Sequence, residues 1–148
     1  MDQSETVGRP MEILLVEDDL EDAGLTMDAL CRGSVKCRVS LVRDGEEAME
    51  FLRRQGKFAR APRPDLILLD LNLPKLSGRE VLAEIRNDGV FTDVPIVVLT
   101  ASRTHREILE QEHLHVEDYL TKPVDLDQFV SVVQSLRRYW LAEVILPH

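Results

Sequence analysis

Three short stretches of the chain are almost continuously apolar, and they limit the possible folds more than any other feature of the sequence. They span residues 12–16, 66–69 and 96–99, and none of them alternates polar with apolar side chains. Strands with this pattern are buried on both faces, which is typical of a parallel sheet covered by helices. Weaker strand patterns occur at residues 38–42 and 118–121. We therefore expect a parallel sheet of five strands.

The segments between these strands repeat their apolar residues with the period of a helix. The clearest stripe lies near the C-terminus and comprises Phe129, Val132, Val133, Leu136 and Trp140. Helix starts are marked by a capping residue followed three positions later by a carboxylate or amide, a pattern that satisfies free backbone N–H groups. These pairs are Asp44 with Glu47, Ser77 with Glu80, Thr104 with Glu107, and Asp125 with Gln128, and Asp19 is a further candidate cap. Five strands alternating with five helices predict a doubly wound α/β fold in a single domain.

Composition and charge exclude several classes of protein. The 148 residues are 44% apolar and 30% charged, as in a globular domain. No apolar run approaches the roughly 20 residues of a membrane-spanning helix, and the N-terminus has no secretion signal. A net charge of −9 without a basic stripe argues against nucleic-acid binding. Cys31 and Cys37 form no CxxC pair, so we expect reduced thiols in a cytoplasmic protein.

Polar residues follow the C-terminal ends of the expected strands. Glu17 and Asp18 follow the first strand, Asp70 ends the third, Thr100 ends the fourth, and Lys122 follows the fifth. In a parallel sheet these ends lie along one edge, where doubly wound folds place their ligand sites. Carboxylates gathered there repel one another unless a cation compensates, and oxygen ligands suit Mg²⁺. We therefore expect a magnesium site at this edge.

In combination these residues resemble the receiver domains of bacterial two-component response regulators. The resemblance covers about residues 11–136, and the spacing fits, with 30 residues from Asp70 to Thr100 and 22 from Thr100 to Lys122. Glu17 and Leu73 replace the commoner Asp and Met, but they keep the charge and the bulk. The motifs are Glu17-Asp18, the segment from Asp70 to Gly78 (DLNLPKLSG), Thr100-Ala101 and Lys122-Pro123.

The resemblance implies that Asp70 accepts a phosphoryl group from a phosphohistidine of a sensor histidine kinase. It also implies that Asp18 and Asp70 bind Mg²⁺ directly, that Glu17 binds it through water, and that the backbone carbonyl of Asn72 supplies another oxygen. The protein would then be a phosphoacceptor that catalyses only its own phosphorylation and dephosphorylation, and not an enzyme acting on separate substrates.

Four further residues acquire roles from the same resemblance. Lys122 would neutralise charge on the phosphoryl group in transfer, and the Thr100 hydroxyl would bind one of its oxygens. Pro123 would follow a cis peptide bond that directs Lys122 into the site. Tyr119 would turn inward as Thr100 moves, and this turn would alter the face around the fifth strand.

The chain is most similar to the small regulators of cyanobacterial and bacterial phytochromes, so we expect a phytochrome-type kinase as its partner. The expected organisation is an N-terminal arm (residues 1–10), a receiver domain (residues 11–138) and an apolar C-terminal extension (residues 139–148). So short an extension holds no output domain, and we expect signalling through protein contacts. Its apolar residues predict a twofold homodimer through the last helix and the tail, although they could instead fold back onto their own domain: Tyr139, Trp140, Leu141, Val144, Ile145 and Leu146.

Other interpretations fit the residues less well. A phosphatase of the haloacid dehalogenase type also uses an aspartate at a strand end, but it needs an acid two positions later, where this chain has Asn72. A flavin or nucleotide module is disfavoured because none of the seven glycines forms GxG. A degenerate receiver is disfavoured because the four characteristic polar residues are present. His113 and His115 could bind a transition metal, but a surface pair is favoured.

Overall fold

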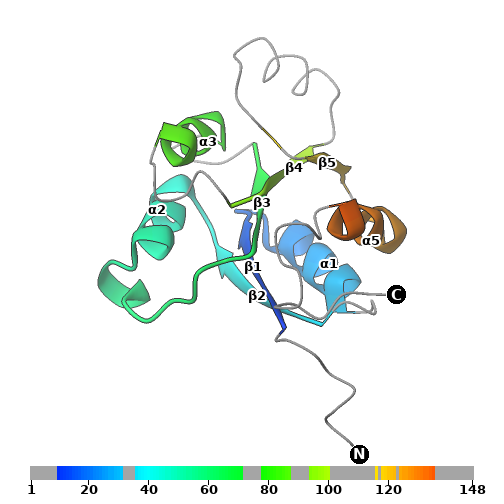
Figure 1. Ribbon diagram of the computed structural model, residues 1–148, viewed down its shortest axis with the longest axis horizontal. Coiled ribbons are helices and arrows are strands. Elements are labelled where there is room, and N and C mark those ends of the chain that lie inside the picture. The colour runs from blue at the N-terminus through cyan, green and yellow to red at the C-terminus, as the bar shows by residue number, and fades with distance from the viewer. Residues whose placement is uncertain are drawn as a thin grey trace, which may run out of the picture.

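The computed structural model describes residues 10–31, 36–71, 78–87, 94–100, 116, 118–122 and 124–135. In these ranges five parallel strands form one sheet, as predicted, and the order of the strands in the sheet is β2-β1-β3-β4-β5. Figure 1 shows the sheet crossing the centre of the molecule. The strands are β1 (Met11–Val16), β2 (Cys37–Val42), β3 (Leu66–Asp70), β4 (Ile96–Thr100) and β5 (Asp118–Thr121).

Four α-helices lie within the described ranges, and their positions agree with the apolar stripes of the sequence. A short 3-10 helix, η2 (Gly56–Phe58), lies in the segment between α2 and β3. The expected helix beginning near Thr104 lies outside the described residues, so the fifth helix stays a prediction. The α-helices are α1 (Leu20–Cys31), α2 (Gly45–Arg53), α3 (Gly78–Asn87) and α5 (Leu126–Ser135).

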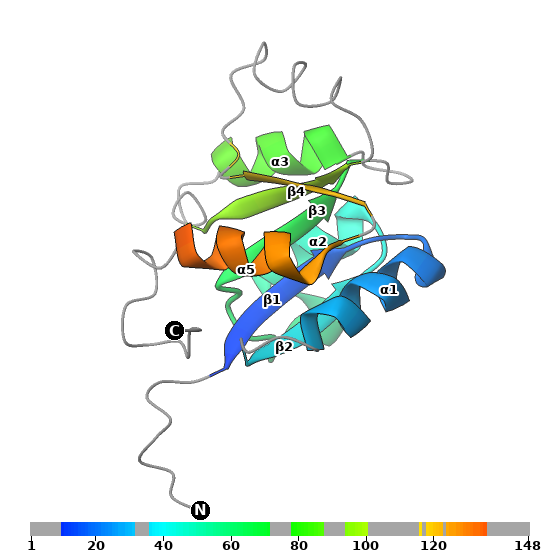
Figure 2. The ribbon, with the colours of Figure 1, turned by 90° about the vertical axis from the view of Figure 1, so that its right-hand side faces the viewer.

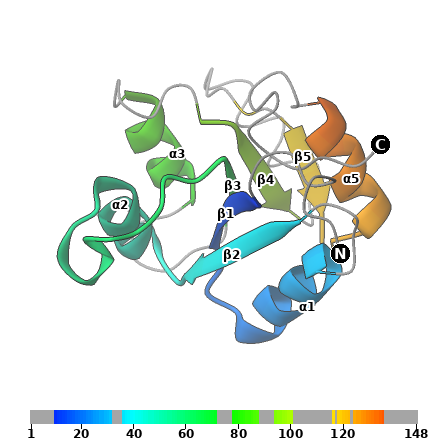
Figure 3. The ribbon, with the colours of Figure 1, turned by 60° about the horizontal axis from the view of Figure 1, so that its bottom comes forward.

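The helices cover both faces of the sheet in pairs. Helices α2 and α3 pack on one face and α1 and α5 on the other, which Figures 2 and 3 show from two directions. Successive side chains of a strand point to opposite faces, so Leu14 and Val16 join the first layer, whereas Ile13 and Leu15 join the second. All six residues of β1 are buried, as expected for a strand between two helical layers. The predicted doubly wound fold is confirmed.

Two predicted helix caps are present. Asp44 Oδ1 accepts a hydrogen bond of 2.8 Å from the Glu47 backbone N–H at the start of α2, and Glu47 Oε1 accepts one from the Arg43 N–H. Asp19 Oδ1 accepts from the N–H groups of Glu21 and Asp22 at the start of α1. These bonds satisfy donors that the first turn of a helix leaves free. The caps predicted at Ser77 and Thr104 lie outside the described residues.

The parallel register brings the strand ends to one edge of the sheet. Val16 of β1 pairs with Leu69 of β3, Asp70 pairs with Leu99 of β4, and Thr100 pairs with Thr121 of β5. Strand β1 lies between β2 and β3. The connection after β1 leads to β2 on one side of it, and the connection after β2 leads to β3 on its other side. In doubly wound folds this change of direction opens a ligand crevice at the C-terminal ends of the strands. No helix in the described ranges has the length and hydropathy needed to cross a lipid bilayer.

Gly78 begins α3 directly against the end of β3. A Cβ atom at this position would lie 2.5 Å from Leu71 Cα and 2.6 Å from the carbonyl oxygen of Asp70. The Gly78 N–H also donates to the Leu71 carbonyl at 3.2 Å. Only glycine permits this approach of two backbones, which fixes the segment carrying Asp70 against α3.

We therefore expect Gly78→Ala to lower the free energy of unfolding by about 1–3 kcal/mol, because backbone atoms must move apart to admit the methyl group. Urea denaturation would measure the change. Gly24 in the middle of α1 is the matched control, since no atom beyond its chain neighbours and the adjacent backbone of its own helix lies within 4 Å of its added Cβ. There alanine should stabilise the helix by about 0.5–1 kcal/mol. Equal effects at the two glycines would contradict the close approach at Gly78.

Candidate functional site

Three carboxylates meet at the C-terminal edge of the central strands. Glu17 and Asp18 follow β1, and Asp70 is the last residue of β3. One oxygen from each carboxylate can be chosen so that all three lie within 4.8 Å of one another. Glu17 is fully buried and Asp70 is 3% exposed, whereas Asp18 is half-buried. The structure thus brings together the three acids that the strand pattern predicted to be close.

Lys122 follows β5 and reaches into the same cluster. Its Nζ lies 2.8 Å from Asp70 Oδ2 and 2.7 Å from Glu17 Oε1, and its side chain is 19% exposed. Burial by itself lowers the pKa of this ammonium, but the hydrogen bond to Asp70 and the contact with Glu17 outweigh burial and raise the pKa above its usual value. Lys122 is therefore a permanent positive charge beside the carboxylate of Asp70.

Glu17 is the carboxylate most affected by its surroundings. Burial raises the pKa of Glu17 to about 8, the neighbouring Asp70 carboxylate adds to this, and Lys122 acts in the opposite direction. Although Lys122 Nζ is close, no donor among the described residues makes a well-directed hydrogen bond to either oxygen of Glu17. When ionised, the three carboxylates carry more negative charge than the single ammonium of Lys122 compensates.

These features fit a hard divalent cation. Magnesium and manganese ions favour carboxylate oxygens, and the pocket offers three carboxylates of which one is buried without hydrogen bonds. A cation held there by Glu17, Asp18 and Asp70 would favour the ionised form of Glu17 and so oppose the effect of burial on its pKa. The structure thus agrees with the predicted cation site.

The raised pKa predicts how pH affects the metal-free protein. Glu17 binds its proton more tightly in the folded chain than in the unfolded chain. Its contribution to stability is therefore complete below its usual pKa of 4.5 and is lost as the pH rises through about 8. Thermal unfolding in EDTA should show this loss, and Mg²⁺ should raise the melting temperature more at about pH 9 than at about pH 6. In Glu17→Gln the pH dependence in EDTA should be weaker, and an unchanged dependence would contradict the assignment to Glu17.

The remaining predicted site residues are only partly described. The backbone of Thr100 ends β4 and pairs with Thr121, so it lies at the same edge as the carboxylates. The Thr100 side chain, Asn72 and Pro123 lie outside the described part of the structure, so their roles stay predictions.

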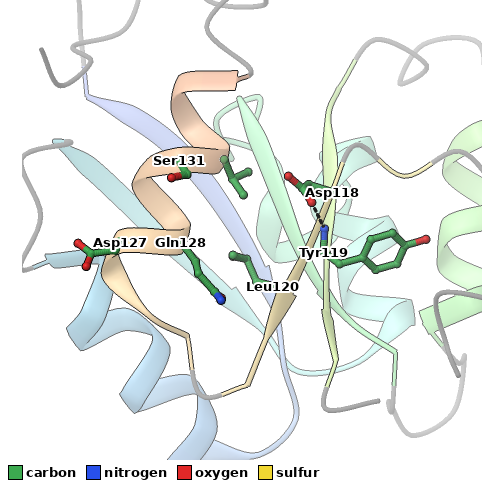
Figure 4. A pocket seen from close by; sticks show the side chains of 7 residues that line it. Asp118, Tyr119, Leu120, Asp127, Gln128 and Ser131 are labelled. Carbon is green, nitrogen blue, oxygen red and sulfur yellow. Dashed lines mark hydrogen bonds between the residues drawn. The ribbon is translucent and has the colours of Figure 1, made fainter. Parts of the chain in front are cut away.

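Tyr119 lies in the middle of β5 and is half-buried. Its ring packs against the α2–α3 side of the sheet, whereas the next residue, Leu120, belongs to the opposite layer. Figure 4 shows the Tyr119 ring pointing away from α5, while Leu120 points into the hollow between β5 and α5. The Tyr119 N–H is held by Asp118 Oδ1 at 2.8 Å. This position is that of a half-buried strand aromatic, and the predicted inward turn remains a prediction.

Two residues near the site were given no role by the sequence. Asp22 in the first turns of α1 lies 3.2 Å from Lys122 Nζ, although 100 residues separate the two. Gly78 belonged to the motif that begins at Asp70, but its close contact with the end of β3 was not anticipated. The sequence feature that could have indicated a role for Asp22 is its place in the helix that follows the acidic pair, four residues after Asp18.

Comparison with known proteins agrees with this geometry. The response regulator receiver domain family matches residues 13–134 of the chain. Response regulator Rcp1 of Synechocystis sp. is 44% identical over 138 residues, which cover 93% of this chain and 94% of that protein.

Two solved structures are also similar to this chain. The phosphorylated cyanobacterial phytochrome response regulator RcpA is 46% identical with a TM-score of 0.73, over 95% of this chain and 100% of that one. The Mn²⁺-bound form of Rcp1 is 44% identical with a TM-score of 0.71, over 94% of this chain and 100% of that one. With the parallel five-stranded sheet and the acidic cluster at its edge, these matches show that the chain belongs to the response regulator receiver domain family.

Proposed function

We propose that this protein accepts a phosphoryl group on Asp70 from a sensor histidine kinase, with Mg²⁺ bound beside it. One observation carries the proposal: the carboxylate of Asp70 lies 2.8 Å from the ammonium of Lys122 and within the cluster of acids that fits a cation. An ionised carboxylate is already a nucleophile and needs no general base. The ammonium of Lys122 compensates part of the negative charge of the carboxylates around it.

The chemistry assigns a task to each group. An oxygen of Asp70 forms a bond to phosphorus while the bond from phosphorus to the kinase histidine breaks, and the electron pair stays on the imidazole nitrogen. Lys122 neutralises the charge on the phosphoryl oxygens, and the Thr100 hydroxyl binds one of them. Asp18, Asp70 and the backbone carbonyl of Asn72 would hold Mg²⁺ directly and Glu17 would hold it through water, and the ion would neutralise a further part of that charge.

The relatives support one class of partner. Similar regulators of known structure include a bacteriophytochrome response regulator and a cyanobacterial phytochrome response regulator, which supports a phytochrome-type kinase as the donor. In this proposal Asp70 is a phosphoacceptor in a cytoplasmic signalling pathway, and the protein catalyses only its own phosphorylation and dephosphorylation. The signal passes to other proteins through the face around β5, where Tyr119 responds to movement of Thr100.

Phosphotransfer from a labelled phytochrome-type kinase tests this function. With Mg²⁺ the chain should acquire label that is stable in acid and labile to hydroxylamine, as expected for an acyl phosphate. Acetyl phosphate provides a second donor that needs no docking surface. Failure of both donors to label the folded protein would contradict the function, whereas labelling by acetyl phosphate alone would contradict only the choice of kinase.

We also propose the division into an N-terminal arm (residues 1–10), a receiver domain (residues 11–138) and an apolar extension (residues 139–148). The extension supports a twofold homodimer, because its apolar side chains continue the stripe of α5 beyond what one sheet needs. Residues 136–148 lie outside the described structure.

Light scattering should therefore give twice the chain mass for the full-length protein and the monomer mass for a truncation after Arg138. Burial of apolar area between two copies supplies the stability of the dimer, and the truncation removes that area. A full-length chain that stays monomeric with and without beryllofluoride would contradict the dimer.

A further inference from the structure

The ammonium of Lys122 has a third carboxylate partner, which comes from a different element. Asp22 Oδ2 in α1 lies 3.2 Å from Lys122 Nζ, in addition to the contacts with Glu17 and Asp70. An ammonium carries three N–H groups. Lys122 donates hydrogen bonds to Asp70 Oδ2 and Asp22 Oδ2, and it is in ion-pair contact with Glu17 Oε1. The backbone around Asp22 is fixed, since its N–H is capped by Asp19 at the start of the helix.

Asp22 differs from the other two partners in its position. Glu17 and Asp70 belong to the cluster that fits a cation, and Asp22 does not belong to that cluster. Its side chain is 41% exposed, and it belongs to α1, which covers the same face of the sheet as α5. Among the described residues, Asp22 is thus the carboxylate partner of Lys122 that a bound cation does not compete for.

We propose that Asp22 is a positioning residue, which holds the Lys122 ammonium in place when the cation occupies Glu17 and Asp70. Lysine has a long and flexible stem, so an ammonium without a fixed partner would sample many positions. A partner on α1 restricts it to the mouth of the site, next to the carboxylate of Asp70. The proposal rests on the proposed function, because Lys122 acts there on the incoming phosphoryl group.

A direct measurement of Lys122 tests the positioning without any phosphoryl donor. Competitive acetylation with mass spectrometry reports how reactive each lysine is, and the exposed Lys36 serves as internal reference. In the Mg²⁺-loaded protein, Asp22→Ala should raise the reactivity of Lys122 by about threefold to fivefold, the size expected for a partly exposed ion pair. Asp22→Asn keeps an acceptor oxygen without the charge, so its effect should be intermediate.

The matched control is Glu21→Ala. Glu21 is an exposed acid in the same first turn of α1, so its removal changes the net charge and the helix dipole equally. No described contact joins its side chain to Lys122, and its variant should leave the reactivity of Lys122 unchanged. An equal rise in Glu21→Ala and Asp22→Ala would overturn the proposal, because it would show a general effect of charge.

Labelling by acetyl phosphate in Mg²⁺ gives the second readout. Asp22→Ala should slow labelling by about threefold to fivefold, and it should have no further effect in a Lys122→Ala background. An equal slowing in both backgrounds would overturn the proposal, since Asp22 would then act independently of Lys122. If the wild-type protein takes no label, the proposed function fails, and the acetylation experiment still decides whether Asp22 holds Lys122.

Discussion

Asp70→Asn should abolish labelling by acetyl phosphate and by a phosphorylated kinase. An amide has almost the same shape as a carboxylate but is not a nucleophile at neutral pH, so the phosphoryl group has no acceptor. The amount of label on the protein can be measured after gel electrophoresis. This substitution should have the largest effect of any in the chain, because Asp70 is the only proposed site of bond formation.

The fold should survive this change. Asparagine retains an oxygen that can accept from Lys122 Nζ, which lies 2.8 Å from Asp70 Oδ2. Circular dichroism and thermal unfolding of the variant should therefore resemble those of the wild type. Wild-type yields of acid-stable, hydroxylamine-labile phosphate on folded Asp70→Asn protein would contradict the assignment of Asp70.

Asp18→Ala should remove both cation binding and phosphotransfer. Mg²⁺ has few protein ligands and keeps much of its hydration shell, so the loss of one direct ligand is severe. We expect labelling to slow by about two orders of magnitude or more, since the charge of the phosphoryl group is then poorly neutralised. Calorimetric titration with Mg²⁺ and labelling by acetyl phosphate would measure the two effects.

Glu21→Ala again provides a matched control for lost charge, because Glu21 lies close in sequence but outside the acidic cluster. It should bind Mg²⁺ and take label as the wild type does. If the wild-type protein is labelled as well in excess EDTA as in Mg²⁺, the result would contradict the proposed role of the cation.

The sheet could be predicted closely because each strand carries a local signal. The continuously apolar runs at β1, β3 and β4 occur only where both faces are buried, and the predicted ranges differ from the observed strands by one residue at most. The sequence patterns of the edge strands β2 and β5 were weaker. For β2 this agrees with its partial burial in the structure. Register then follows from the topology, which brings Glu17, Asp18 and Asp70 to one edge.

Other features depend on contacts that no local pattern reveals. The ion pair between Asp22 and Lys122 joins α1 to the residue after β5, and its existence depends on how α1 lies on the sheet. The need for glycine at position 78 comes from the backbone of Asp70 and Leu71, which belongs to another element. The raised pKa of Glu17 likewise requires its burial and the distance to Asp70 to be known.

Reduction of the labelled protein with borohydride tests the central claim most directly. Borohydride converts an aspartyl phosphate to homoserine, and mass spectrometry of peptides then locates the modified residue. The proposed function predicts homoserine at position 70 in protein treated with acetyl phosphate and Mg²⁺, and none in protein treated without a phosphoryl donor. Homoserine at a different aspartate, or phosphate retained on a serine, threonine or histidine with Asp70 unchanged, would contradict it.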